Sequence, residues 1–128
     1  MIGQKQKRGL WGEILAARYL RDRGYTILGA NYRTRLGEVD LIADGEGVRA
    51  FCEVKTRTPD AFGLPLDAVD VKKQRRMIAA AGQYVASRDY QGAIRFDVLE
   101  VFLQSDGVGE VRHIKEAFDG DLSLHQGR

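Results

Sequence analysis

The stretch that decides the fold is residues 37–57, GEVDLIADGEGVRAFCEVKTR. It contains two runs in which apolar and polar residues alternate, joined by DGEG, whose Asp-Gly and Gly content is typical of a tight hairpin turn. The pattern predicts β-strands over residues 37–43 and 48–55, with residues 44–47 as the loop. In that register Ala43 pairs with Val48.

The polar face of this hairpin is dense in acids. Because successive side chains of a strand point to opposite faces, one face carries Glu38, Asp40, Glu53 and Lys55. The predicted register places Glu38 opposite Glu53 and Asp40 opposite Phe51, which makes Asp40 and Glu53 diagonal neighbours about 7–8 Å apart at the backbone. Such a face can simply be solvated, but like charges on one sheet face repel, and a single lysine does not offset three acids.

Two apolar residues on the same face, Ile42 and Phe51, indicate partial cover rather than open solvent. A divalent cation would relieve the repulsion, since magnesium takes hard oxygen ligands from one or two carboxylates.

The first predicted helix points a carboxylate toward the sheet. Residues 9–23, GLWGEILAARYLRDR, are amphipathic, with an apolar stripe of Leu10, Ile14, Ala17 and Leu20, and Gly24 is a suitable C-terminal stop. Glu13 falls within the stripe, where a carboxylate must be paired, hydrogen-bonded or close to a metal. The alternatives are a salt bridge to an arginine or a side chain that extends to the rim of the core.

A second helix is predicted over residues 67–87, with Asp67 as the N-cap and an apolar stripe formed by Val71, Ile78, Ala81 and Val85. Gln74 lies on this inward stripe, either near the acids or as a cap for a strand end. Both helices would thus direct a polar group toward the acidic sheet face.

The remaining elements complete an α/β fold. Strands are predicted over 25–33, 93–103 and about 110–115, and residues 58–66 form a loop with both prolines. Arg95 and Asp97 share a strand face as a structural ion pair. The order helix, three strands, helix, two strands indicates a mixed β-sheet flanked by helices. A chain of 128 residues fits one domain, 1–128, with flexible ends at 1–8 and 119–128.

Composition excludes several classes of protein. The single cysteine, Cys52, rules out an internal disulfide and a cysteine-built zinc site, and we expect it to be a buried core residue. The chain contains no apolar run of membrane-span or signal-peptide length, which predicts a cytoplasmic protein with no membrane partner. Residues 1–35 hold eight Lys or Arg and two acids, so this basic third suits a polyanionic partner.

One arrangement of residues resembles the motif of the PD-(D/E)xK nuclease superfamily, whose fold is restriction-endonuclease-like. It consists of Asp40, twelve further residues, and then Glu53-Val54-Lys55. More closely, GEILAARYL, RGYTILGANYRTRLGEVDLIA, FCEVKTR, FGLPLDAVDVKKQRR and RFDV are similar to the YraN family of small bacterial proteins. That family is regarded as predicted endonucleases, distantly similar to archaeal Holliday-junction resolvases.

The resemblance implies roles for individual residues. Asp40 and Glu53, with the Val54 carbonyl, would bind Mg²⁺ or Mn²⁺. Lys55 would orient the attacking water or offset transition-state charge, and Glu13 would act through a metal-bound water. Glu38 and Gln74 are accessory candidates.

A nuclease also needs cations that attract phosphates. The candidates for nucleic-acid binding are Arg33, Arg35, Arg57, Lys72, Lys73, Arg75 and Arg76. The expected partner is DNA, including branched or damaged DNA, and the question of a homodimer stays open. The alternative is a non-catalytic nucleic-acid-binding module that keeps the nuclease fold.

Overall fold

The computed structural model describes residues 4–58, 60 and 69–120. The elements are α1 (Gln4–Asp22), β1 (Thr26–Arg33), β2 (Glu38–Gly45), β3 (Val48–Arg57), α2 (Val71–Ser87), β4 (Ala93–Leu103) and β5 (Gly109–Phe118). The predicted order of helix, three strands, helix and two strands is confirmed, and the fold is a single-domain α/β fold consistent with a nuclease-like architecture.

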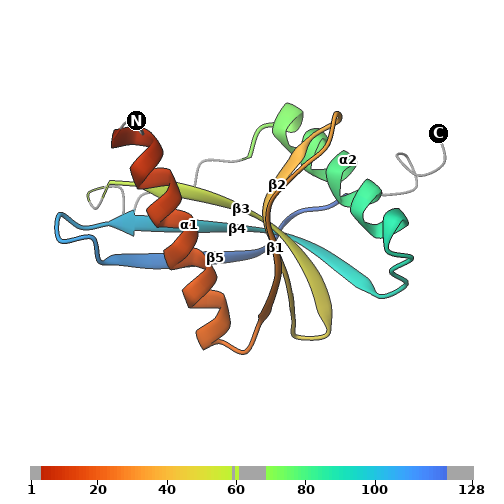
Figure 1. Ribbon diagram of the computed structural model, residues 1–128, viewed down its shortest axis with the longest axis horizontal. Coiled ribbons are helices and arrows are strands. Elements are labelled where there is room, and N and C mark those ends of the chain that lie inside the picture. The colour runs from red at the N-terminus through yellow and green to blue at the C-terminus, as the bar shows by residue number, and fades with distance from the viewer. Residues whose placement is uncertain (1–3, 59, 61–68, 121–128) are drawn as a thin grey trace.

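The five strands form one mixed sheet in the order β1-β2-β3-β4-β5. Strands β3 and β4 are parallel, and every other neighbouring pair is antiparallel. Parallel neighbours need a long crossover connection, which here contains α2. In Figure 1, α1 crosses over β3, β4 and β5, whereas α2 lies beside β2, away from α1.

Helix α1 rests on the sheet through small residues. Gly12, Ala16 and Leu20 are buried, and a Cβ on Gly12 would lie 2.2 Å from the Thr56 hydroxyl oxygen. Leu10 and Ile14, predicted to face the core, are each 47% exposed. The stripe prediction was wrong at these two positions because close approach to the sheet favours the small residues over the large ones.

The first helix also starts earlier than predicted, at Gln4 instead of residue 9, so residues 4–8 are helical. Residues 1–3 and 121–128 of the predicted flexible ends lie outside the described residues, as does most of the predicted 58–66 loop. The C-terminal stop at Gly24 is confirmed: this glycine has a φ of 90°, a conformation that glycine adopts without strain.

Helix α2 begins at Val71, four residues later than predicted, and Asp70 is its N-cap. The Asp70 carboxylate accepts a hydrogen bond from the Lys73 amide at 2.8 Å, which satisfies one of the free N–H groups of the first turn. The predicted cap, Asp67, lies outside the described residues. Val71 is exposed rather than inward, because it stands at the very start of the helix, whereas the burial of Ile78, Ala81 and Val85 is confirmed.

The turn between β2 and β3 contains two residues, not the four predicted. Glu46 and Gly47 both have positive φ values, 55° and 79°, which is the geometry of a type I′ hairpin turn. Gly45 therefore pairs with Val48, and Ile42, not Asp40, pairs with Phe51. Because the register moved by two residues, the paired residues Leu41–Gly45 and Val48–Cys52 keep their predicted faces. Val39 does not: beyond the paired part it packs with Ile42 and Phe51 instead of with Leu41.

Each sheet face has its own hydrophobic core. One core lies between the sheet and α2 and includes Ile42, Phe51 and Met77. The other lies under α1 and includes Leu20 and Cys52, whose predicted burial is confirmed. No helix in the part of the chain that the structure describes has both the length and the hydrophobicity of a membrane span.

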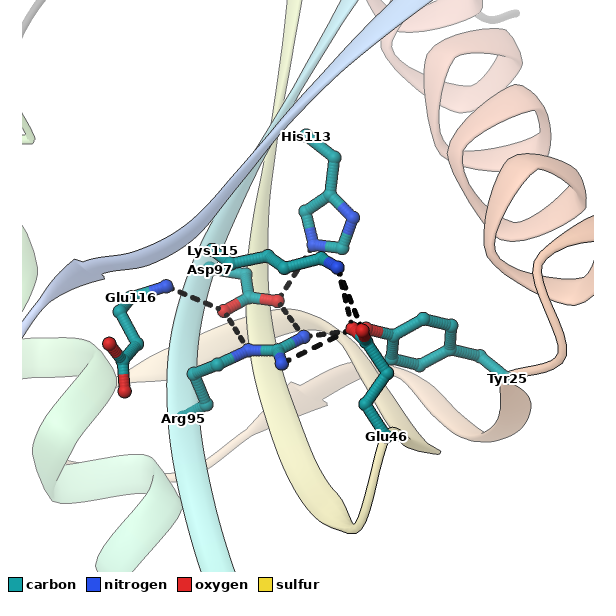
Figure 2. A network of polar contacts seen from close by, with 7 residues as sticks. All are labelled: Tyr25, Glu46, Arg95, Asp97, His113, Lys115 and Glu116. Carbon is teal, nitrogen blue, oxygen red and sulfur yellow. Dashed lines mark hydrogen bonds and ion pairs between the residues drawn. The ribbon is translucent and has the colours of Figure 1, made fainter.

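A polar network fastens the β2–β3 turn to β4 and β5 (Figure 2). The Arg95 guanidinium donates two hydrogen bonds of 2.8 Å to the buried Asp97 carboxylate, and Nε2 of His113 lies 2.7 Å from the same group. Arg95 also donates to the Tyr25 hydroxyl at 2.6 Å, which in turn donates to Glu46 in the turn. The predicted structural ion pair of Arg95 and Asp97 is thus confirmed.

Gly37 sets the distance between β2 and α2. A Cβ at this position would lie 1.8 Å from the Arg76 carbonyl oxygen, a backbone atom that cannot move aside cheaply. We expect Gly37→Ala to lower the free energy of unfolding by about 3 kcal/mol, because overpacking forces backbone shifts. Urea unfolding of this variant beside Gly29→Ala tests this, since a methyl group at Gly29 would meet nothing within 4 Å. Equal stability of the two variants would contradict the prediction.

Candidate active site

Asp40 lies where β2 and β3 separate. The paired part of the hairpin ends at Leu41 and Cys52. At this point the Asp40 carboxylate accepts a hydrogen bond of 2.8 Å from the Val54 amide, which replaces a bond of the strand ladder. Continuing the register by one residue would bring Asp40 level with Glu53, in place of the diagonal arrangement predicted from the sequence.

Glu53 has one carboxylate oxygen without a hydrogen-bond partner among the described residues. Its side chain is 14% exposed, and its Oε2 is buried and accepts no hydrogen bond from the described residues. The other oxygen, Oε1, lies 3.7 Å from the Lys73 ammonium. Buried carboxylate oxygens are normally hydrogen-bonded, so this one is available to a ligand.

The surroundings of the two acids disfavour their charged forms. Burial raises the pKa of Asp40 and of Glu53. Repulsion raises them further: the Glu13 and Glu38 carboxylates act on Asp40, and the Asp40 carboxylate acts on Glu53. The nearby Lys73 ammonium only partly opposes this rise. A carboxyl whose pKa is raised by folding makes the fold less stable once pH rises through that pKa, so at neutral pH this pair destabilises the apo protein.

Lys73 is the central cation of the site, and the sequence did not reveal this. Its Nζ lies 3.5 Å from Glu38 Oε1 and 3.7 Å from Glu53 Oε1, so it bridges β2 and β3 from the first turn of α2. The sequence placed Lys73 only in a cluster of phosphate-binding bases. One sequence feature could have indicated that Lys73 faces the sheet. It lies four residues before Met77, which is fully buried, and residues four apart lie on the same side of a helix.

Glu13 and Lys55 act electrostatically on the acid pair. The charge of Glu13 raises the pKa of Asp40, and the ammonium of Lys55 lowers that of Glu53, so both groups lie within electrostatic range of the acid pair. The partner of Glu13 is not an arginine: its Oε1 accepts a hydrogen bond of 3.0 Å from Asn31 Nδ2 on β1. That contact holds the carboxylate at the sheet edge.

Gln74 has a structural partner. Its side-chain amide donates to the Val69 carbonyl at 2.8 Å, just ahead of α2, so its partner is neither the acid pair nor a strand end.

Arg57, a predicted phosphate-binding residue, forms an ion pair with a buried carboxylate outside the acid pair. Its guanidinium lies 2.6 Å from the carboxylate of the buried Glu100, which Arg112 also pairs with at 2.5 Å. We therefore assign Arg57 primarily to this buried ion cluster.

The other predicted phosphate-binding bases surround the site on exposed surface. Arg33 is 72% exposed and approaches Glu38 to 3.4 Å. The exposed members of the set are Arg35, Lys72, Arg75 and Arg76. Their positions at the β1–β2 turn and on the first turns of α2 bring positive charge to the rim of an acidic centre.

The site offers oxygen ligands and little else. No three His, Cys, Asp or Glu side chains within the described residues are grouped as a complete metal cage. Two carboxylates, those of Asp40 and Glu53, and a backbone carbonyl at Val54 nevertheless suit Mg²⁺, which usually keeps several waters and takes only one or two protein carboxylates.

Comparisons with known proteins agree with the motifs. A profile of the uncharacterised protein family UPF0102 matches residues 12–101, which include every acid of the site. The chain belongs to the UPF0102 family. This is the family, also called YraN, whose resemblance the sequence motifs indicated.

The family's members align with nearly the whole chain. A UPF0102 protein of Anaeromyxobacter dehalogenans is 47% identical over 119 residues, covering 91% of this chain and 87% of the relative. A UPF0102 protein of Caldanaerobacter subterraneus is 44% identical over 117 residues, covering 89% of this chain and 96% of the relative. One of Nocardia farcinica is 42% identical over 118 residues, covering 91% and 93%.

Proposed function

We propose that this UPF0102 protein is an endonuclease that hydrolyses DNA phosphodiesters with the help of Mg²⁺ or Mn²⁺. The observation that carries the proposal is the buried, unpartnered Oε2 of Glu53 beside a second buried carboxylate, Asp40. A protein gains no stability from this pair, because burial and repulsion penalise both charges. Such an arrangement is typical of a site kept for chemistry.

The residues fit a hard divalent cation. Asp40, Glu53 and the Val54 carbonyl are the oxygen ligands that would hold it, and water and a substrate phosphate would fill the remaining positions. When bound, the ion would supply Lewis-acid stabilisation of the phosphate and lower the pKa of a coordinated water.

The remaining polar groups have distinct tasks. The Lys55 ammonium, close enough to Glu53 to lower its pKa, would orient the attacking water and stabilise negative charge on the reacting phosphate. Glu13, held by Asn31, would position water from the α1 side. Lys73 would keep Glu38 and Glu53 oriented from the α2 side.

The rim of exposed arginines and lysines supports a polyanionic substrate. Contacts from these side chains to phosphates would be independent of base sequence and strongly weakened by salt. Three exposed bases, Lys72, Arg75 and Arg76, lie in the first two turns of α2. They would contact the phosphates of the DNA backbone on one side of the scissile bond.

The test is a cleavage assay on linear, flapped, single-stranded and four-way-junction DNA with Mg²⁺, Mn²⁺, Ca²⁺ or EDTA. We expect cleavage with Mg²⁺ and Mn²⁺ and none in EDTA. An Asp40→Asn protein purified in the same way controls for contaminating nucleases. Cleavage that survives in this variant, or in EDTA, would overturn the proposal.

A protein that cuts none of these substrates but binds them all would be a non-catalytic nucleic-acid-binding module. In that case DNA affinity would be the same for the wild type and Asp40→Asn, because no phosphate contact would pass through the acid.

A further inference from the structure

A groove opens beside the candidate active site, at the ends of β3 and β4. Its volume is about 700 Å³, and its walls come from the start of α1, the end of β3 and the β4–β5 turn. Its lining residues include Lys7, Arg8, Trp11, Arg57 and Gln104. The space is large enough for a nucleotide-sized ligand, since small-molecule sites span about 300–1,000 Å³.

The charge of the groove is uniformly positive. Lys7, Arg8 and Arg57 line it, and none of its described lining residues is acidic. The charge of Arg57 is offset by Glu100, so Lys7 and Arg8 are the cations offered to a ligand. Lys7 and Arg8 are exposed on α1. Arg57 is held in the wall by its 2.6 Å ion pair with Glu100. Asp106, in the β4–β5 turn and outside the lining, accepts a hydrogen bond of 3.0 Å from the Val108 amide and keeps its negative charge.

Trp11 forms an anchored aromatic wall. Its indole N–H donates a hydrogen bond to the Gly107 carbonyl across the β4–β5 turn, so the ring cannot swing freely. The turn is itself braced by hydrogen bonds from Gln104 N–H to Val108 O at 2.7 Å and from Gly107 N–H to Gln104 O at 3.0 Å. An aromatic ring fixed beside cations is the arrangement that proteins use to stack a base while binding its phosphates.

The groove is continuous with the candidate active site along β3. Lys55 and Arg57 are two residues apart on one strand and therefore project from the same face, about 6–7 Å apart along the strand. Thr56, between them, faces Gly12 of α1, so Lys55 and Arg57 project away from α1. A nucleic-acid strand that leaves Lys55 would therefore pass round the end of β3, beside Arg57, to reach the wall formed by Trp11 and Arg8.

We propose that this groove binds a single-stranded segment of nucleic acid adjoining the cleaved bond, with phosphates at Lys7 and Arg8 and a base against Trp11. The inference rests on the proposed nuclease function and adds a substrate class, DNA with a single-stranded branch or end. A single strand is favoured over a duplex because only unpaired bases present a face to an aromatic side chain.

Tryptophan fluorescence reads this groove directly, since Trp11 is the only tryptophan of the chain. Wild-type protein in EDTA, where it does not cleave, is titrated with a short single-stranded oligonucleotide and with the matching duplex. We expect saturable quenching by the single strand and a much weaker response to the duplex. An equal response to both would overturn the single-strand assignment.

Removing positive charges inside and outside the groove tests whether binding depends on the groove or only on the overall positive charge of α1. In Lys7→Ala/Arg8→Ala the slope of log affinity against log salt should fall by about 1.4, and affinity at 0.1 M salt by about 20-fold, since each single-strand phosphate contact contributes about 0.7 to the slope. Arg18→Ala/Arg21→Ala removes two exposed cations from the same helix outside the groove and should retain wild-type affinity. Equal losses in the two double variants would overturn the proposal.

The aromatic wall is tested with two substitutions. Trp11→Ala should weaken single-strand binding by about tenfold, within the range for one stacked base, and Trp11→Phe should recover most of it because a ring remains. Loss of binding in both variants to the same extent, at unchanged melting temperature, would count against stacking.

The groove and the nuclease can fail separately. If the wild type cleaves DNA but neither quenching nor the Lys7/Arg8 effect is seen, the groove proposal fails and the nuclease stands. If the groove responses appear but no substrate is cut with Mg²⁺ or Mn²⁺, the nuclease proposal fails and the groove remains a strand-binding site.

Discussion

The Asp40→Asn protein will lose about three orders of magnitude of cleavage rate while its fold becomes no less stable. A carboxylate that binds the metal directly is worth several kcal/mol of transition-state stabilisation, and each 1.36 kcal/mol corresponds to tenfold in rate. The asparagine oxygen can still accept the hydrogen bond from the Val54 amide. Since the pKa of Asp40 is raised by burial and by neighbouring acids, removing its charge relieves a destabilising interaction at neutral pH.

Two measurements check this together. Single-turnover cleavage gives the rate, and thermal unfolding with and without Mn²⁺ gives both stability and metal binding, because a ligand that binds only the folded state raises stability. The wild type should melt higher with Mn²⁺, and Asp40→Asn should not. Asp44→Asn, a strand neighbour paired with Arg49 outside the site, is the matched control and should cleave normally. A strongly destabilised Asp40→Asn protein would mean that the acid is structural.

Lys55→Ala distinguishes the ammonium from the metal ligands. It should cleave as slowly as Asp40→Asn under the same conditions, yet it should keep the Mn²⁺-dependent rise in melting temperature, because both carboxylates remain. Loss of the metal response in Lys55→Ala would show that the lysine acts by organising the acid pair.

The strands and the composition of the acidic face were predictable because they depend on local periodicity. Alternation along residues 37–57 determines which side chains share a face, and a register error of two residues left that assignment unchanged in the paired part of the hairpin. It failed at Val39, beyond the paired part, which packs with Ile42 and Phe51. The turn length was not predictable in the same way. It depends on Glu46 adopting a φ of 55°, which a non-glycine residue does only in the context of the formed hairpin and of its contact with Tyr25.

The parts of the site that the sequence missed come from tertiary contacts. In the sequence, Lys73 is one of several basic residues at the start of a helix. Only the packing of α2 on β2 shows that its ammonium bridges Glu38 and Glu53. Likewise, Arg57 looked available for phosphate until the fold placed the buried Glu100 beside it. Long side chains with free rotation carry no sequence signal for which partner they reach.

Asp97→Asn will be the most destabilising single substitution of a charged residue described here, lowering the free energy of unfolding by about 3–5 kcal/mol. The Asp97 side chain is fully buried and accepts hydrogen bonds from Arg95 and from the Glu116 amide, with His113 Nε2 at 2.7 Å (Figure 2). Removing its charge leaves the Arg95 guanidinium, only 9% exposed, without its bidentate partner. A loss of this size corresponds to about 10–20 °C in melting temperature for a domain of this length.

Asp44→Asn again supplies the comparison. The Asp44–Arg49 pair has the same bidentate geometry, with distances of 2.7 and 2.9 Å, but Asp44 is 41% exposed. Exposed ion pairs contribute about 0–1 kcal/mol, so this variant should unfold close to the wild type. Similar losses in the two variants would show that burial does not decide the strength of the Asp97 pair.

The difference between wild type and Asp97→Asn should also depend on pH. Burial alone would raise the pKa of Asp97, but hydrogen bonds from His113, Arg95 and the Glu116 amide outweigh it and lower that pKa. A lowered folded-state pKa contributes stability above the unfolded pKa of about 3.9, and the contribution is lost as pH falls through the folded value. Urea unfolding at stepwise lower pH should therefore show the two stabilities converging below about pH 4. A gap that widens with acid would assign the loss to altered packing, since the asparagine side chain does not titrate.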